Sequence, residues 1–208
     1  MVALDLEGKR AVVVGGGAVA RRKVSGLLAS GARVTVIAPE LEPGLSELVR
    51  AGQIEHVARE FAAGDLAGAS VVISATGRVD VNAAVANEAA AVGALVNVVD
   101  DPGRCDFYVP AVVRRGPVTV AITTGGRSPA LARRLRERLA AAIGPEYGAL
   151  AELLGELRPA VLARGRDAAA RRRAWEAVLD SEVLELLQRG ERQAARKKAE
   201  ECISSELD

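Results

Sequence analysis

A short apolar run followed by three glycines constrains this chain more than any other feature. Residues 11–14 read Ala-Val-Val-Val, which is typical of a buried strand, and a helical pattern begins at residue 18. The spacing Gly15-x-Gly17-x-x-Ala20 between them predicts a dinucleotide-binding turn. In such a turn the first glycine allows the tight bend, the second lets the backbone approach a pyrophosphate, and the small third residue lets helix and strand pack closely. A tight turn with no ligand is the alternative, and the strand-turn-helix context favours the dinucleotide.

Apolar strands and helical segments alternate up to residue 99. Strands are expected at 11–14, 33–37, 54–57, 71–75 and 95–99, and helices at 18–30, 45–51 and 81–92, with Asp80 capping the last. Aromatic residues make up only 2% of the chain, so the core must be built from Ala, Val and Leu, which suits strands buried on both faces. The alternation predicts βαβ units in a parallel sheet.

The pattern changes after Cys105. Apolar runs at 107–113 and 118–123 are joined by a segment too short for a crossover helix, which predicts an antiparallel pair. Ser128 is a favourable N-cap and Pro129 a favourable first residue for the helix that follows. In that helix an apolar residue recurs every four positions, which predicts a packed partner helix. The residues of this stripe are Leu131, Leu135, Leu139 and Ile143.

The remainder of the chain is expected to be helical, with a break or kink at Pro159 and a charged, fraying end at 191–208. Two apolar helix faces are expected there: one holds Leu150, Leu153, Leu154, Leu157 and Val161, and the other Trp175, Val178, Leu179, Val183, Leu186 and Leu187. The predicted fold class is therefore α/β: a Rossmann-type parallel sheet, a small α+β segment and a C-terminal helical domain. We expect their bounds at 1–113, 114–146 and 147–208.

Charge, cysteine usage and hydropathy exclude several classes of protein. The net charge is +1, but residues 114–138 hold seven arginines and one glutamate, which indicates an anionic ligand rather than nucleic acid. Cys105 and Cys202 lie too far apart for a disulfide framework or a metal-ligand spacing, and the single His56 is interpreted as structural. No metal site is expected. Acidic residues occur near the start and no apolar run is long enough for a bilayer, so we expect a cytoplasmic protein without membrane contact.

The residues that follow two of the expected strands add detail to the predicted cofactor site. The second strand ends in Ala38-Pro39-Glu40, so the acid that usually binds the adenosine ribose is displaced by a residue or two. Because no arginine stands there for a 2′-phosphate, NAD is preferred over NADP. Thr76 and Gly77, after a later strand, offer close backbone approach to the cofactor, and a plain loop is the alternative.

Asp100 ends the strand at 95–99, on the sheet edge where ligands of α/β proteins bind. A carboxylate in that place can act as a general base. The local sequence Asp100-Asp101-Pro102-Gly103 equally suits a turn in which the side chain caps the backbone. Both interpretations stay open on local grounds.

Thr124, Gly125, Gly126, Arg127 and Ser128 form a second candidate site. Flexible glycines, hydroxyl groups and a helix N-terminus suit the recognition of a carboxylate, and a simple glycine turn before a capped helix is equally consistent. Arginines in and after this segment would grip an anionic substrate, although exposed arginines on a helix are more often only solvated. They are Arg127, Arg133 and Arg134.

Five segments in this order resemble the precorrin-2 dehydrogenase / sirohydrochlorin ferrochelatase family of sirohaem synthesis. They begin at Val13 (VVGGGxVAxRK), Val34 (VTVIAPE), Asn97 (NVVDDP), Cys105 (CDF) and Gly125 (GGxSPxLAR). The similarity extends from about residue 4 to about residue 139. Members that lack a fused methyltransferase domain have about the length of this chain.

The resemblance implies that NAD⁺ accepts a hydride from precorrin-2, giving sirohydrochlorin, and that bifunctional members then insert Fe²⁺ in the same cleft. It implies Asp100 as the catalytic residue, and cofactor contacts from Ala18, Val19, Pro39, Glu40 and the Thr76-Gly77 loop. A polycarboxylate tetrapyrrole would account for the arginine-rich segment. The segment at 114–146 would serve dimerisation, so a homodimer is expected. Some members carry serine at the position of Thr124, where it is linked to phosphorylation.

Three other functions compete with this one. A dehydrogenase-only member of the same family would leave chelation to another protein, and nothing in the sequence excludes it. An NAD(H)-sensing regulatory module should carry a helix-turn-helix or an effector domain, which this sequence does not show. A dehydrogenase for a small anionic substrate should have a His or Lys acid/base near the sheet edge, and none is found there.

Overall fold

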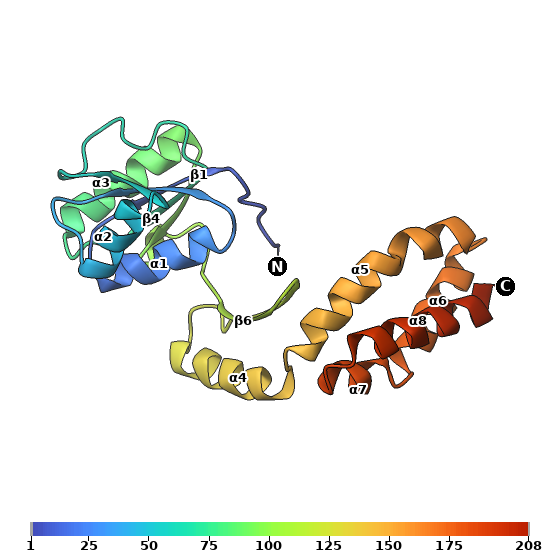
Figure 1. The fold of residues 1–208 in the computed structure, drawn as a ribbon. Coiled ribbons are helices and arrows are strands. Elements are labelled where there is room, and N and C mark those ends of the chain that lie inside the picture. The colour runs from blue at the N-terminus through green and yellow to red at the C-terminus, as the bar shows by residue number, and fades with distance from the viewer. Residues whose placement is uncertain (1, 208) are drawn as a thin grey trace. The chain divides into compact units, whose positions relative to one another are not determined.

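The computed structural model describes residues 2–207, which divide into two compact units between Val109 and Pro110 (Figure 1). The first unit contains β1 (Arg10–Val14), α1 (Ala18–Leu28), β2 (Arg33–Ile37), α2 (Pro43–Arg50), β3 (Ile54–Val57), β4 (Val71–Ser74), α3 (Val79–Val92), β5 (Leu95–Val98) and the short 3₁₀ helix η1 (Pro102–Arg104). The second contains β6 (Ala111–Arg115), β7 (Val118–Ile122), α4 (Pro129–Ala142), α5 (Glu146–Arg164), α6 (Ala168–Leu179), α7 (Val183–Gln188) and α8 (Arg192–Leu207).

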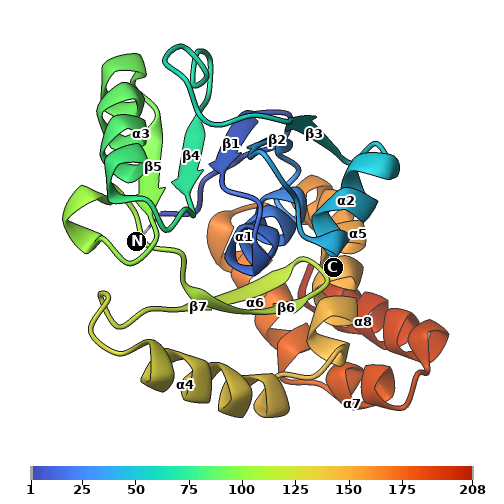
Figure 2. The same cartoon turned by 90° about the vertical axis from the view of Figure 1, so that its left-hand side faces the viewer.

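The first unit is a three-layer α/β fold around one parallel sheet. The strands lie in the order β3-β2-β1-β4-β5, and all neighbours are parallel (Figure 2). Alternate residues of β1 enter different cores: Val13 packs with α1 and α2 on one face, and Val12 packs with α3 on the other. Both faces of the sheet are therefore covered, which explains why the strands read as continuous apolar runs. The predicted Rossmann-type sheet is confirmed.

The strand order places a switch point between β1 and β4. From β1 the chain continues to β2 on one side of the sheet, whereas β4 and β5 lie on the other side. In open α/β sheets, ligands bind at such a point, outside the carboxyl ends of the strands. The glycine-rich turn after β1 lies at this point.

The second unit joins an antiparallel hairpin to a helical bundle. β6 and β7 pair antiparallel, as predicted, and α4 packs against both strands. One apolar core joins α5 to the helices after it, with Leu153, Val161, Val178, Val183 and Ile203 among its most buried members. Among residues 2–207 no helix is long and apolar enough to cross a membrane.

Several local predictions were wrong. Helix α3 begins at Val79 after the N-cap Arg78, and Asp80 lies in its first turn, where it pairs with Arg78. The strand expected at 107–113 begins at Ala111. Of the break or kink expected at Pro159, the break does not occur, because α5 continues through this residue. Leu179, expected on a buried face, is 54% exposed.

The charged end at 192–207 forms the ordered helix α8 rather than fraying. Ala195, Ala199 and Ile203 place one face of this helix in the core. On its other side Arg196 donates to Glu156 of α5 at 2.7 Å. Small buried residues at a spacing of four thus provide the contact face, although the segment is too polar to reveal a core element by hydropathy.

Asp65 stabilises the long connection from β3 to β4 through hydrogen bonds of its carboxylate. Its carboxylate accepts two hydrogen bonds from the Arg59 guanidinium, at 2.6 and 2.7 Å, and one from the Ala62 N–H at 2.8 Å. The hydrogen bonds from Arg59, with the smaller contribution of the Ala62 N–H, hold the pKa of Asp65 below its ordinary value of 3.8.

Replacing Asp65 with Asn is expected to lower the free energy of unfolding by about 1 kcal/mol at neutral pH. Because the folded-state pKa is lowered, the contribution of the ionised carboxylate is fully present above 3.8 and is lost as the pH falls through the lowered value. Urea titrations of the unchanged protein and the Asn variant at pH 7 and pH 3 give the difference in their free energies of unfolding. A difference that grows on acidification would contradict the lowered pKa of Asp65.

Candidate active site

Three consecutive glycines at the carboxyl end of β1 play three different parts. Gly15 has φ +117°, its N–H donates to Ile37 O at 2.9 Å, and a Cβ there would overlap the Ala75 carbonyl. A Cβ on Gly16 would overlap the Glu40 carbonyl. Gly17 has an ordinary φ of −90°, and a Cβ there would meet nothing within 4 Å. The first two glycines therefore let the ends of β2 and β4 close on the turn, and the third borders open space.

The N-terminus of α1 faces that space without a capping side chain. Gly17 is the N-cap, its residue type offers no side-chain acceptor, and no acidic residue lies in the first turn. The N–H groups of Ala18 and Val19 are left for an anionic ligand, to which the positive end of the helix dipole adds. Val19 is 38% exposed, so an apolar side chain lies beside these groups.

The two acids after β2 have different surroundings. Glu42 caps α2 by accepting the Leu45 N–H at 2.9 Å, and it lies 3.7 Å from the Arg21 guanidinium. Its own N–H donates to Gly16 O at 2.8 Å, which ties the segment after β2 to the glycine turn. Glu40 is exposed, and within residues 2–207 its carboxylate has no hydrogen bond or ion pair. Glu40 is thus the acid that remains for a ligand.

A buried polar network shapes the loop after β4. Asn82 of α3 is 9% exposed, and its side-chain oxygen accepts from Ser74 Oγ at 2.7 Å and from Thr76 Oγ1 at 3.2 Å. The Thr76 hydroxyl in turn accepts the Arg78 N–H at 3.0 Å. The neighbouring Gly77 has free space around its Cα. Thr76 therefore supports the loop from within, and Gly77 presents its open side.

Asp100 follows β5 in an unusual backbone conformation. Its φ is +63°, and within residues 2–207 it is the one residue other than glycine with a positive φ. Its side chain is exposed, and no residue of that range hydrogen-bonds to its carboxylate. Asp101, by contrast, pairs with Arg104. Neither carboxylate caps the backbone of this turn within residues 2–207, because Asp101 at the start of η1 bonds only the Arg104 side chain. Asp100 keeps a positive φ with its carboxylate free, as functional residues often do.

Lys23 of α1 points toward the same end of β5. Its Nζ lies 3.4 Å from the side-chain oxygen of Asn97. Burial, and then the charge of Arg22, lower the pKa of Lys23, while the nearby Cys105 and Asp100 oppose this shift. The expectation that no Lys lies near this sheet edge was therefore wrong, because Lys23 and Asn97 meet across 74 residues of the chain, a contact that no local pattern reveals.

The second candidate segment lies in the second unit. Gly125 and Gly126 have φ values of +61° and +78°. The hydroxyl of Thr124 accepts the Ser128 N–H at 3.0 Å, and Ser128 Oγ accepts the Leu131 N–H at 3.3 Å, which confirms the predicted N-cap. Both hydroxyls therefore serve the turn itself. The guanidinium groups of three arginines make no hydrogen bond or ion pair within residues 2–207: those of Arg127, Arg133 and Arg134.

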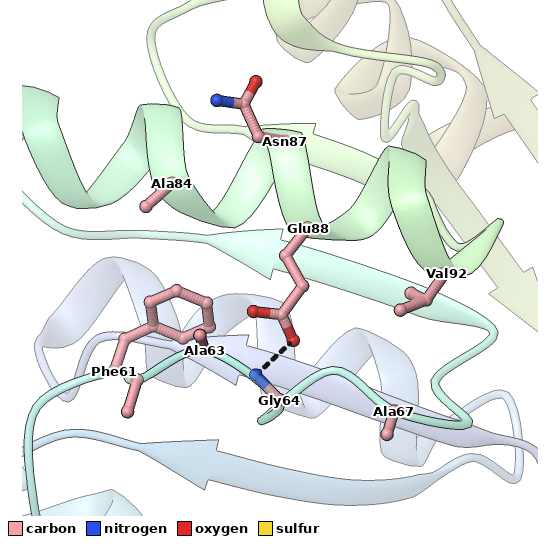
Figure 3. Close-up of a pocket in the computed structure, with 9 residues that line it drawn as sticks. Phe61, Ala63, Gly64, Ala67, Ala84, Asn87, Glu88 and Val92 are labelled. Carbon is pink, nitrogen blue, oxygen red and sulfur yellow. Dashed lines mark hydrogen bonds between the residues drawn. The ribbon is translucent and has the colours of Figure 1, made fainter.

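A cavity of about 660 Å³ lies away from these strand ends (Figure 3). Phe61, Ala63 and Ala67 line it from the β3–β4 connection, facing the second half of α3. Glu88 accepts the N–H of Gly64 at 3.1 Å, the bond drawn in Figure 3. That half of α3 leads back to the amino edge of the sheet, so the cavity is not part of the crevice at the carboxyl edge. Among residues 2–207, no group of three or more His, Cys, Asp or Glu side chains is placed to hold a metal ion.

Three family models match the chain in sequence order. A model described as putative NAD(P)-binding matches residues 2–111. A model of the central region of sirohaem biosynthesis proteins matches 115–142, and a model of the sirohaem synthase dimerisation region matches 146–203.

Individual relatives also carry names from sirohaem synthesis. Siroheme synthase 3 of Aeromonas hydrophila is 44% identical over 202 residues, which cover 97% of this chain and 43% of that protein. The siroheme synthase of Gluconacetobacter diazotrophicus is 46% identical over 199 residues, covering 94% of this chain and 42% of that protein. The chain thus spans less than half the length of these relatives. The solved structure of the precorrin-2 dehydrogenase SirC matches with a TM-score of 0.75 and 26% identity, over 97% of this chain and 98% of that one.

The sheet order, the glycine turn at its switch point and the open helix N-terminus define a Rossmann-type dinucleotide-binding protein. The three family models and the relatives identify one family within this class of dinucleotide-binding proteins. The chain belongs to the precorrin-2 dehydrogenase / sirohydrochlorin ferrochelatase family, as the resemblance predicted.

Proposed function

We propose that the crevice at the carboxyl edge of the sheet binds NAD(H). The open space at Gly17 and the uncapped N–H groups of α1 fit a pyrophosphate. Backbone at Pro39 and the free carboxylate of Glu40 would face the adenosine ribose, and a carboxylate there favours NAD over NADP. Thr76 and Gly77 would approach the cofactor from the next strand end. The family model for residues 2–111 supports this assignment.

We propose further that the protein oxidises precorrin-2 to sirohydrochlorin. The observation that carries this proposal is Asp100: an exposed carboxylate without a partner in the described chain, held at positive φ on the ligand-binding edge. NAD⁺, when bound, supplies the hydride acceptor. Asp100 takes up the proton that the substrate loses in the same oxidation. The likeness to the precorrin-2 dehydrogenase SirC over nearly the whole of both chains supports this function.

Ferrochelation is proposed as a second activity of the same carboxylate. Insertion of Fe²⁺, a substrate here, displaces the pyrrole N–H protons of sirohydrochlorin, and Asp100 would accept them. A dehydrogenase-only protein is the alternative. The similarity to part of proteins named siroheme synthase supports the bifunctional form, and the likeness to the precorrin-2 dehydrogenase SirC suits the alternative equally.

The polycarboxylate substrate would meet the segment Thr124–Ser128. The N–H groups of Gly125, Arg127 and Ser128 are engaged within the turn, so the recognition of carboxylates would rest on the arginines. The free guanidinium groups of Arg127, Arg133 and Arg134 can pair with carboxylates. The hydroxyl of Thr124 serves the turn before α4.

We propose that the protein works as a homodimer in the cytoplasm. Leu131 is 51% exposed, and the other members of the apolar stripe are only half-buried, so the stripe is incompletely covered within residues 2–207. The match to a dimerisation region supports a second copy as its partner. Functional parts at 1–113, 114–146 and 147–208 would then bind the cofactor, join the subunits and complete the dimer. The two free cysteines suit a reducing compartment.

An anaerobic assay tests the two activities in turn. Purified protein is mixed with precorrin-2 and either NAD⁺ or NADP⁺, and the absorbance of reduced cofactor and of sirohydrochlorin is followed. We expect faster turnover with NAD⁺. Fe²⁺ is then added, and metal insertion faster than in a protein-free control would establish chelation. No acceleration would make the protein dehydrogenase-only, and binding of NAD⁺ without turnover would point to a sensing module.

A further inference from the structure

The turn that carries Asp100 is closed by a hydrogen bond from the Asp101 N–H to the Val98 carbonyl oxygen at 3.3 Å, and the side chain of Cys105 contacts the backbone at both ends of it. The Val98 N–H donates to the Cys105 sulfur at 3.3 Å. The same sulfur lies 3.2 Å from the Val98 carbonyl oxygen and 3.3 Å from that of Asp101, so the thiol proton has an acceptor on either side of Asp100. The thiol therefore bridges Val98 and Asp101, the first and last residues of the turn that contains Asp100.

Cys105 is itself anchored by a buried amide. The side-chain N–H₂ of Asn97, a residue 6% exposed, donates to the sulfur at 3.4 Å and to the Phe107 carbonyl oxygen at 2.9 Å. Its oxygen faces Lys23 Nζ at 3.4 Å. Helix α1, strand β5 and the turn after it are thus connected through polar side chains.

Positive φ at Asp100 needs such support. A residue with a side chain rarely adopts this conformation unless its surroundings determine it. The Asp100 carboxylate makes no bond within residues 2–207 that could pay for the strain, so the support must come from the backbone on either side. Cys105 is the side chain that contacts that backbone on both sides.

We propose that Cys105 is a positioning residue for Asp100, acting through the turn at 98–101 with Asn97 as its anchor. The proposal rests on the proposed function of Asp100. A thiol suits this place because it is small, donates and accepts weak hydrogen bonds, and reaches farther than a hydroxyl. Cys105 forms no disulfide, so it stays available for these contacts.

A double-mutant cycle on the dimeric protein tests the proposal. Cys105→Ala is expected to lower kcat for precorrin-2 oxidation by about 10- to 100-fold, with the KM for NAD⁺ unchanged. In an Asp100→Ala background the same change should have no further effect, because the residue it positions is gone. Cys105→Ser should recover part of the rate. The matched control is Cys202→Ala, in α8, which should leave kcat unchanged.

An equal loss from Cys105→Ala in both backgrounds, or no loss in either, would overturn the proposal. A second measurement separates it from the proposed function. The Cα and carbonyl ¹³C chemical shifts of Asp100 report its backbone conformation, whether or not the protein turns over precorrin-2. These shifts should move in Cys105→Ala, or in Cys105→Ser should the alanine variant fail to fold, and stay fixed in Cys202→Ala. Unmoved shifts would refute the positioning role even in an active enzyme.

Discussion

Replacing Asp100 with Asn is expected to lower kcat for precorrin-2 oxidation by about 10²- to 10⁴-fold, the usual cost of losing a general base. Asparagine has nearly the same shape and tolerates positive φ, so the turn should persist. Only the capacity to take up a proton is removed. The KM for NAD⁺ should stay close to that of the unchanged protein, since the crevice residues are untouched. Steady-state rates of NADH formation under anaerobic conditions measure the effect.

Asp101→Asn is the matched control for this prediction. The two acids are adjacent, but Asp101 pairs with Arg104, whereas the Asp100 carboxylate has no partner in the described chain. The Asp101 variant should lose less than about fivefold, the modest cost of a surface ion pair. Equal losses in both variants would show that the negative charge of the turn matters, and not the proton acceptor at Asp100.

Replacing Gly17 with Ala is expected to raise the Kd for NAD⁺ by about tenfold or more, while the free energy of unfolding changes little. The reason is geometric. A Cβ at Gly17 meets no protein atom within 4 Å and φ there suits any residue, so the methyl group would occupy only the space proposed for the pyrophosphate. Calorimetric titration with NAD⁺ and urea unfolding separate the two quantities.

Two further glycines make this test specific. Gly26 lies in the last turn of α1, also with nothing within 4 Å of an added Cβ, so Gly26→Ala should leave NAD⁺ affinity unchanged and stabilise the helix by about 0.5 kcal/mol. Gly16→Ala should destabilise the protein instead, because its Cβ would overlap the Glu40 carbonyl. Normal NAD⁺ binding by a folded Gly17→Ala protein would place the cofactor elsewhere.

Local signals in the sequence predicted most of the first unit. Strands β2 and β3 and the Ser128 cap match the expected residues because buried apolar runs, turn residues and capping side chains act over a few positions. Features decided by distant contacts were not predictable in this way. The polar helix α8 is ordered by its contacts with other helices, and α3 begins before Asp80.

In the candidate site, too, local sequence patterns predicted some features, and contacts between distant residues decided the others. The glycine motif identifies Gly15 and Gly17, but the motif leaves position 16 open, and only the fold shows the Glu40 carbonyl against Gly16. Asp100 could be selected by its place after a strand, yet its backbone strain is visible only in the structure. Lys23 meets Asn97 across 74 residues, and Asn97 meets Cys105 only through the turn after β5, so no local pattern encodes these contacts.

A single-turnover experiment tests the central claim most directly. Protein in excess over precorrin-2 is mixed anaerobically with NAD⁺, and both products are followed in one cuvette. We predict that NADH and sirohydrochlorin appear at the same rate and in equal amounts, and that Asp100→Asn slows both equally. Sirohydrochlorin formed at an unchanged rate without NAD⁺, or bound NAD⁺ with precorrin-2 left intact, would contradict the account.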